Sequence, residues 1–349
     1  MPRIAKLWLV LAVLGASIAA AVVGNVAGQG EASTARPGAG QKARSVVLAF
    51  GGDVHFEGAL EAKLASDPRR VLAPIAPLLD GADLAIVNLE TAVTDGGAPV
   101  AKQFAFSAPP SAFAALRGGG VDVASMANNH GMDFGTSGLR DSLAAAKRYG
   151  FPVIGIGLDE KRAYRPFRRT INGQRIAVIG ATQVLDDELI SAWTAGARKP
   201  GLASAKKVPR LLREVRSARA TADTVVVFLH WGVELDMCPT QDQRTLARRL
   251  VAAGADIVVG GHAHRLQGAG RMRDALIGYG LGNFVWYGTS ALSTRTGVLF
   301  VTVTGREVNR YHWAPARIVD GVPRPLEGSE RKHELASWRS LRACTGLEP

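Results

Sequence analysis

Short apolar runs alternate with longer helical patterns along most of the chain. The apolar runs are rich in β-branched residues and have no polar face; they are "SVVLAF" (45–50), "LAIVNLE" (84–90), "VDVASMANNH" (121–130), "TVVVFLHWG" (224–232) and "ADIVVGGHAH" (255–264). Between them lie segments such as "SGLRDSLAAAKRYG" (137–150), with apolar residues at helical spacing and a final glycine. Strands that are apolar throughout and are separated by helices predict a layered α/β fold whose sheets are buried on both faces.

Two hairpins are expected to add antiparallel strands. "FRRTINGQRIAVIG" (167–180) contains Asn172-Gly173 between two strand-like runs, and this dipeptide readily adopts positive φ. A second antiparallel pair is expected about Thr304-Gly305. The sheets are therefore predicted to be mixed.

The N-terminal region carries a signal for export. Arg3 and Lys6 precede an uncharged apolar run from Leu7 to Val23, so residues 1–28 are interpreted as a signal peptide or an N-terminal membrane anchor. Residues 29–44 are rich in Gly, Ala, Ser and charge and predict a flexible linker. We expect residues 45–320 to form one domain outside the cytoplasm, membrane-anchored or secreted, with residues 321–349 as a C-terminal tail packed on it.

The net charge bears on the partner of the protein, and the cysteines bear on its compartment. The net charge is +12, and residues 45–349 keep +8 because the first 44 residues hold five bases and one acid. This excess suits an anionic envelope polymer or its precursor, and not a nucleic acid, although a solvated basic surface explains it equally well. Two cysteines occur, and outside the cytoplasm we expect a Cys238–Cys344 disulfide that ties the tail down. Metal ligation by one thiol is the alternative, but neither cysteine has a CxxC or CxH neighbour.

Side chains that bind metals gather where the predicted strands end. They are Asp53 and His55 after the first run, Glu90 at the end of the second, Asn128, Asn129 and His130 at the third, His230 at the fourth, and His262 and His264 at the fifth. Each residue alone is more often a cap or a core residue. Together, about seven oxygen and nitrogen donors are too many for one tetrahedral ion and predict a site for two metal ions.

The order and the wording of these motifs resemble a known family. "GGDVHFEG", "LAIVNLETAVT", "VASMANNHGMDFG", "VVVFLHWGVE", "ADIVVGGHAHRLQG" and "YGLGNFVW" resemble the CapA-type capsule-synthesis proteins, the poly-γ-glutamate biosynthesis branch of the calcineurin-like metallophosphoesterases. The resemblance covers roughly residues 46–304. It implies a four-layer sandwich of two mixed β-sheets flanked by helices.

The resemblance also assigns roles residue by residue. It places Asp53, His55 and His264 on one metal ion, Asn129, His230 and His262 on the other, Glu90 as the bridging carboxylate, and His130 beside them as the acid. These donor types suit two divalent ions such as Mn, Fe or Zn. The chain departs from the phosphoesterases at the bridge, where Glu90 stands in place of an aspartate. The longer side chain changes the spacing and puts phosphatase activity in question.

Further polar and aromatic residues near the motifs are candidates for lining the cleft or orienting ligands. They are Asn128, Asp133, Trp231, Glu234 and Asn283. Core packing or turn chemistry explains each of them equally well. The paired glycines at 51–52 and 260–261 are expected to let backbones approach closely at crowded strand ends.

The predicted function is a metal-dependent hydrolase or transferase of the cell envelope. The residues themselves argue for metal-activated attack on a phosphoester, amide or ester, and the resemblance adds capsule or poly-γ-glutamate assembly, with other membrane capsule-assembly proteins as partners. Two alternatives stay open. One is an extracytoplasmic phosphoesterase unrelated to capsule, and the other is a non-catalytic component of a polymer assembly or export machine in which metal stabilises the fold.

Overall fold

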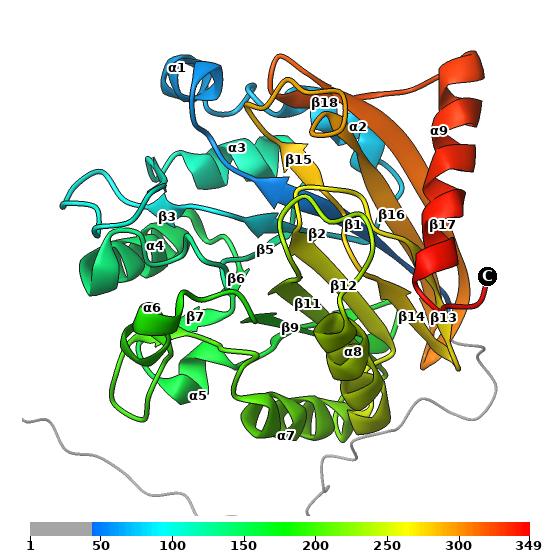
Figure 1. Ribbon diagram of the computed structural model, residues 1–349. Helices are drawn as coiled ribbons and strands as arrows, with labels where there is room; N and C mark the ends of the chain where they lie inside the picture. The colour runs from blue at the N-terminus through cyan, green and yellow to red at the C-terminus, as the bar shows by residue number, and fades with distance from the viewer. Residues whose placement is uncertain (1–43) are drawn as a thin grey trace, which may run out of the picture. The chain divides into compact units, whose positions relative to one another are not determined.

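Two mixed β-sheets form the centre of the protein (Figure 1). The computed structural model describes residues 44–349. The predicted leader and most of the predicted linker therefore lie outside the described residues. Between residues 44 and 349, no helix is both long and apolar enough to cross a bilayer.

The first sheet has eight strands and combines parallel and antiparallel pairs. Its order is β18 (Val322–Pro325), β17 (Glu307–Val319), β16 (Arg295–Thr304), β1 (Val46–Val54), β2 (Leu84–Leu89), β5 (Val123–Ser125) and β6 (Val153–Ile154), and β15 (Asn283–Val285) also pairs with β1. Strands β1, β2, β5 and β6 run parallel, whereas β16, β17 and β18 pair antiparallel. The segment after residue 320 thus contributes the edge strand β18.

The second sheet has six strands, and its four central strands are parallel. Its order is β13 (Ala269–Met272), β14 (Ala275–Gly278), β12 (Ile257–His262), β11 (Thr224–Trp231), β9 (Gln174–Thr182) and β8 (Phe167–Ile171). Two small sheets pair β3 (Ala92–Val93) with β4 (Ser107–Ala108), and β7 (Ile156–Gly157) with β10 (Gly201–Leu202).

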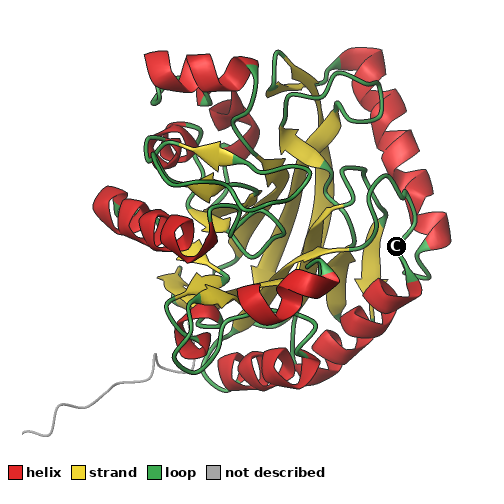
Figure 2. Ribbon diagram, turned by 60° about the vertical axis from the view of Figure 1, so that its left-hand side comes forward, coloured by secondary structure: helices red, strands yellow, loops and turns green. Residues whose placement is uncertain are grey.

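Helices surround the two sheets, as Figure 2 shows in red around the yellow strands. They are α1 (Ala59–Ser66), η1 (Ala73–Ile75), α2 (Ala76–Leu79), α3 (Ala112–Gly118), α4 (Gly135–Tyr149), α5 (Glu160–Ala163), α6 (Asp187–Trp193), α7 (Val208–Arg219), α8 (Gln241–Ala253), α9 (Gly328–Ser340) and η2 (Leu341–Cys344). Helices α3 and α4 pack on the first sheet and α7 and α8 on the second. The predicted helix at 137–150 is α4, which ends at Gly150 in the left-handed conformation.

Three layers of apolar contact hold this arrangement together. Leu48 and Phe50 of β1 pack between the sheets with Val226 and Phe228 of β11, while Ala49 faces the outer helices. The alternation follows from the period of two in a strand, because successive side chains leave opposite faces. Buried faces on both sides of each sheet give the four layers, helix, sheet, sheet and helix. The predicted fold class is confirmed.

The first strand continues further than its apolar run indicates. The sequence places Asp53 after the strand, but β1 extends to Val54, and Asp53 pairs with Asn88 of β2 and Asn283 of β15. The register shifts between Phe50 and Asp53. The glycines make this possible: a Cβ on Gly52 would lie 1.9 Å from the carbonyl oxygen of Gly282.

Both predicted hairpins are present. Asn172 and Gly173 have φ of 52° and 80° and join β8 to β9, while β16 and β17 pair antiparallel across the turn after Thr304. The structure also joins Cys238 and Cys344, the pair expected from the cysteine count. Their disulfide links the segment before α8 to the end of the chain.

Candidate metal centre

The strand ends of both sheets meet at one edge of the sandwich and bring the predicted donors together. In the first sheet, Glu90 follows β2 directly, and residues 128–130 follow β5. In the second sheet, His230 is the penultimate residue of β11 and His262 the last residue of β12. The backbone N–H of His262 donates to Oδ2 of Asp53 at 2.9 Å, so the two sheets are joined at this point.

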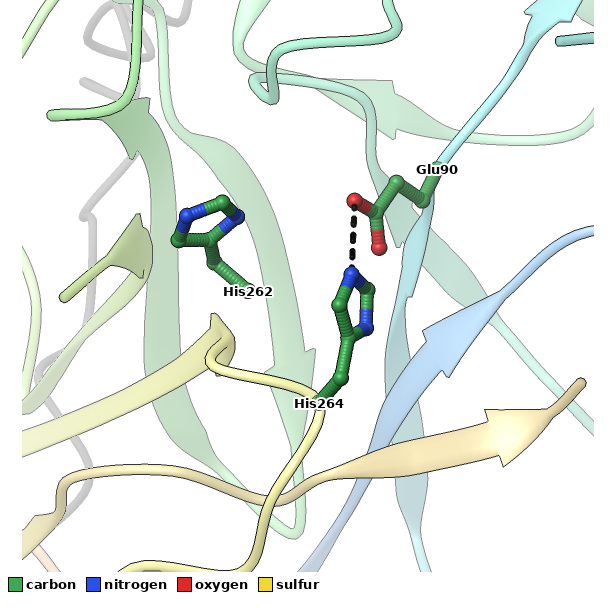
Figure 3. Close-up of side chains that lie close together, drawn as sticks. All are labelled: Glu90, His262 and His264. Atoms are coloured by element: carbon green, nitrogen blue, oxygen red, sulfur yellow. Dashed lines mark ion pairs between the residues drawn. The ribbon is translucent and has the colours of Figure 1, made fainter. Parts of the chain in front are cut away.

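Glu90 lies at the centre of the cluster. Its Oε1 is 3.4 Å from Nε2 of His230, 3.9 Å from Nε2 of His264 and 4.0 Å from Nε2 of His130. The side chain is fully buried, and neither carboxylate oxygen has a hydrogen-bond partner. Figure 3 shows Glu90 and His264 facing one another, with His262 beside them. A buried carboxylate without donors is costly unless a cation compensates it.

Two groups of side chains could each hold an ion. One consists of Asp53, Glu90 and His230, and the other of Glu90, His262 and His264, with the ligand atoms of each group within 4.8 Å of one another. Glu90 belongs to both groups, as a bridging ligand would. The other members divide differently from the sequence-based assignment, which pairs Asp53 with His264. Since Nδ1 of His264 is also 3.5 Å from Oδ2 of Asp53, the assignment of each residue to an ion stays a prediction.

A network of buried amides holds the ligands in place. Nδ2 of Asn88 donates to Oδ1 of Asp53 at 2.9 Å and lies 3.1 Å from Nδ1 of His230. Asn128 in turn donates to Oδ1 of Asn88 at 3.0 Å. Oδ1 of Asn129 is 2.6 Å from Nε2 of His230. Asn88 was not among the residues predicted for the site, although it lies in β2 two residues before Glu90, a spacing that places both side chains on the same face.

Burial dominates the electrostatics of the centre. It raises the pKa of Asp53 to about 7 against the hydrogen bonds from His262 and Asn88, and it raises the pKa of Glu90 well above its ordinary value. It lowers the pKa of His262 to about 3 and that of His264 to about 4. The imidazoles are therefore neutral at physiological pH, the form that binds metal ions.

His130 is held by Asp133, which the sequence placed among the secondary candidates. Nδ1 of His130 is 2.6 Å from Oδ2 of Asp133, and the ring of Phe106 stacks on the imidazole with centroids 4.2 Å apart. Asp133 is fully buried and receives a hydrogen bond from Nζ of Lys102 at 2.9 Å. The Asp133 carboxylate can only accept a hydrogen bond, so Nδ1 of the neutral His130 ring carries the proton and donates it. The lone pair of Nε2 is then directed toward Glu90.

His55 lies next to the cluster in an aromatic setting. Its ring stacks on Trp286 with centroids 3.9 Å apart, and the Trp286 ring is 4.4 Å from that of His264. His55 is fully buried, and neither ring nitrogen has a partner. Neither of the two candidate ligand groups includes it. Its predicted ligand role stays a prediction.

The remaining secondary candidates separate into three kinds. Trp231 is fully buried in the outer core of the second sheet and donates to the carbonyl oxygen of Tyr279, so its predicted place in the cleft is wrong. The reason is the alternation in β11, which turns Trp231 away from the face of His230. Oδ1 of Asn283 is 2.8 Å from Nδ1 of His264 and orients that ring. Glu234 is exposed, and its charge helps to raise the pKa of Glu90.

The donor set fits divalent metal ions. Both oxygens of Glu90, Nδ1 of His262 and both ring nitrogens of His55 are buried without partners, although buried polar groups in proteins are nearly always paired. Mixed carboxylate, amide and imidazole donors suit Mn, Fe or Zn. A cation at Glu90 would give its two unpaired oxygens a partner.

Comparison with known proteins establishes the family. The family described as "Bacterial capsule synthesis protein PGA_cap" matches residues 47–287. The chain belongs to this family. Capsule biosynthesis protein CapA of Bacillus anthracis is 30% identical over 248 residues, which are 70% of this chain and 59% of that protein. PGA biosynthesis protein CapA of Bacillus subtilis (strain 168) is 31% identical over 214 residues, 61% of this chain and 55% of that protein.

The chain thus spans less than two thirds of the length of these two curated relatives in the PGA_cap family. Among solved structures, a hypothetical protein from Thermus thermophilus superposes with a TM-score of 0.50 at 18% identity, covering 78% of this chain and 100% of that chain. At this identity the likeness shows a shared fold. The family predicted from the motifs is confirmed.

Proposed function

We propose that this PGA_cap protein is a dinuclear metal-dependent hydrolase of the cell envelope that acts in capsule or poly-γ-glutamate synthesis. The observation that carries the proposal is Glu90, a fully buried carboxylate without donors, placed between His230, His264 and Asp53. A structural role alone would not require so costly a group. Two divalent ions held there supply Lewis-acid polarisation of the scissile bond and of water.

Residues of this chain would provide the rest of the chemistry. Glu90, which belongs to both candidate groups, would contact both ions, and the remaining ligands would come from Asp53, His55, Asn129, His230, His262 and His264. The Nε2 atom of His130 faces this cluster, while Asp133 holds the ring from the other side. A proton taken up at Nε2 is therefore positioned for delivery to the leaving oxygen.

The proposed location and partner rest on independent features. The apolar segment at residues 7–23 favours export, and the Cys238–Cys344 disulfide is typical of an oxidising compartment. The net charge of +8 after residue 44 favours an anionic polymer or its precursor. Relatives named for capsule and PGA biosynthesis support that pathway. Other membrane capsule-assembly proteins remain proposed partners.

Metal analysis and turnover test the proposal together. We expect about two transition-metal ions per chain after loading with Mn²⁺ and removal of excess metal. We expect hydrolysis of 4-nitrophenyl phosphate or its phosphodiester to depend on Mn²⁺ and to fall by a factor of roughly 10² to 10⁴ in His130→Ala. His333→Ala, an exposed histidine of α9, is the matched control and should keep wild-type activity.

The two readouts separate the alternatives. Absence of metal under saturating conditions would overturn the dinuclear site. Two bound ions with no turnover of phosphoesters, amides or esters would leave the metal with a structural role, and the protein would then be a non-catalytic component of the polymer machinery. If the purified protein hydrolyses phosphoesters but a strain that lacks it makes a normal amount of polymer, a general phosphoesterase would be favoured.

A further inference from the structure

The loop between β3 and β4 packs against His130 beside the candidate metal centre and is hydrogen-bonded to Asp133. The backbone N–H of Val100 donates to the carbonyl oxygen of Asp133 at 2.8 Å, and that of Phe106 donates to its Oδ2 at 2.7 Å. The Nζ of Lys102 donates to its Oδ1 at 2.9 Å. Both carboxylate oxygens are therefore occupied, and the loop and the His130 ring share one buried anchor.

Lys102 makes a second contact that connects the two sides of His130. Its Nζ donates to the carbonyl oxygen of Asn129 at 2.6 Å, and its side chain is 11% exposed. The ammonium also lies 5.3 Å from the ring centroid of Trp193. The Lys102 ammonium thus binds the backbone of Asn129 and the side chain of Asp133, which lie on either side of His130 in the sequence.

We propose that Lys102 is a positioning residue that sets the orientation of both His130 and Asn129. With Lys102 on Oδ1 of Asp133, the other oxygen stays directed at Nδ1 of His130. This contact selects the ring tautomer whose Nε2 lone pair faces Glu90. For its kinetic consequence the inference rests on the proposed function.

The same ammonium acts on the ligand side through the backbone. The hydrogen bond from Lys102 fixes the orientation of the peptide group of Asn129 and thereby the direction of its side chain. In this orientation Oδ1 of Asn129 lies 2.6 Å from Nε2 of His230. Removal of Lys102 takes one donor from the carbonyl oxygen of the half-buried Asn129 and one from the carboxylate of the buried Asp133. Both side chains then gain freedom to turn away from the cluster.

A lysine suits this position because the two acceptors lie in different directions. The ammonium is a compact charge with three donors that rotate about the terminal bond, so it serves a carbonyl and a carboxylate at the same time. The guanidinium of arginine is a planar fork and larger. Lys102→Arg should therefore restore the charge and part of the geometry, whereas Lys102→Met keeps the length and removes every donor.

The first test uses the metal-free protein and needs no activity. Two-dimensional ¹H–¹⁵N spectra of the imidazoles at pH 8 report which nitrogen of His130 carries the proton. We expect a single Nδ1–H form in the wild type, a mixture of tautomers in Lys102→Met, and recovery of the single form in Lys102→Arg. Lys147→Met, an exposed lysine of α4, should leave the spectrum unchanged.

The second test measures kcat and KM for 4-nitrophenyl phosphate at saturating Mn²⁺. We expect kcat to fall by roughly 10- to 100-fold in Lys102→Met, with KM unchanged within about threefold, because outer partners of ligands have effects of this size. Lys102→Arg should have a higher kcat than Lys102→Met. The control Lys147→Met should keep the wild-type kcat. If Lys102 merely supported the fold, its replacement would lower the thermal stability without lowering kcat at an unchanged KM.

Failure of the Lys102 inference can be distinguished from failure of the proposed function. A wild-type imidazole spectrum in Lys102→Met overturns the inference, whether or not the protein turns over any substrate. If the wild type shows no turnover, the proposed function fails and the spectra still decide the role of Lys102. Lys102→Leu, which also removes every donor, provides the same comparison if Lys102→Met does not fold.

Discussion

Among single residues, Glu90 sets the balance between stability and metal binding. Its carboxylate lies in a fully buried position with no donor, and its pKa is raised well above the ordinary value by burial, with Asp53 adding to the effect. A group of this kind lowers the stability of the metal-free fold. The same group becomes favourable when cations are bound, so its contribution changes sign with metal.

Glu90→Gln should separate these two effects. Because the variant removes a buried acid of nearly the same shape, we expect the free energy of unfolding in chelator to equal the wild-type value or exceed it by about 1–2 kcal/mol. Stabilisation by added Mn²⁺ should be lost, since the bridging oxygen pair is gone. Urea denaturation with and without Mn²⁺ measures both quantities. A Glu90→Gln variant with a lower free energy of unfolding in chelator that is still stabilised by Mn²⁺ would contradict this account of Glu90.

Metal affinity should rise with pH between 6 and 8. Burial raises the pKa of Asp53 to about 7, so at pH 6 the metal-free protein holds a proton there that a metal ion must displace. At pH 8 the carboxylate is already ionised. His262 and His264, whose pKa values are lowered to about 3 and about 4, are neutral across this range and do not oppose the trend.

Isothermal titration calorimetry in buffers of different ionisation enthalpy measures this linkage. We expect Mn²⁺ binding to release protons at pH 6 and fewer at pH 8. The sign is fixed by the raised pKa of Asp53, because protons and metal compete for the same oxygens. Affinity that is constant over the range would show that Asp53 is ionised throughout.

Among the elements, the close contact of β1 with β12 shapes the site. A Cβ on Gly261 of β12 would lie 2.1 Å from Oδ1 of Asp53 in β1. On Gly260 it would lie 2.0 Å from Nε1 of Trp231. Gly261 therefore permits the two sheets to approach at the centre, whereas Gly260 leaves room for the indole of Trp231 within the second sheet.

Gly261→Ala should displace the Asp53 carboxylate and abolish high-affinity Mn²⁺ binding. The overlap should also lower the free energy of unfolding by about 1–3 kcal/mol. Calorimetric titration and urea denaturation provide the measurements. Gly96→Ala is the matched control, because a Cβ there meets nothing within 4 Å and its φ is not positive. Retained metal binding in Gly261→Ala would mean that Asp53 is not needed at this position.

At the scale of the whole molecule, the disulfide closes the chain onto itself. Cys238 and Cys344 are 106 residues apart, and Arg244 at the start of α8 also donates to the carbonyl oxygen of Cys344 at 2.6 Å. The loop between them contains β12 and most of the antiparallel part of the first sheet. The C-terminal segment is thereby held against the second sheet, where Arg271 and Glu348 form a β-bridge.

The double variant Cys238→Ser/Cys344→Ser should lower the free energy of unfolding by roughly 2–5 kcal/mol, because the crosslink restricts the unfolded chain. Urea denaturation of the variant and of the wild type in dithiothreitol should agree. A loss below about 1 kcal/mol in both would show that the reduced chain is already restrained. We expect metal content to be unchanged, since neither sulfur belongs to the candidate ligand groups.

The sequence alone determined the local features and the inventory of donors. Asn172-Gly173 predicts its hairpin because the turn depends on the backbone preference of two residues, and the apolar runs predict buried strands because periodicity is local. The motifs around Asp53, Glu90 and His262 were sufficient for the family. The end of β1 was predicted too early, since the strand continues through Gly51 and Gly52 by pairing with distant strands.

The tertiary structure decided which donors meet and what supports them. Asp53 and the backbone of His262 are 209 residues apart, and Lys102 and Asp133 are 31 apart, so no local pattern could reveal either contact. Trp231 could be assigned to the core only once the face of His230 was known. Burial and charge pairing are properties of residues brought together by packing, whereas sequence patterns record the preferences of neighbours along the chain.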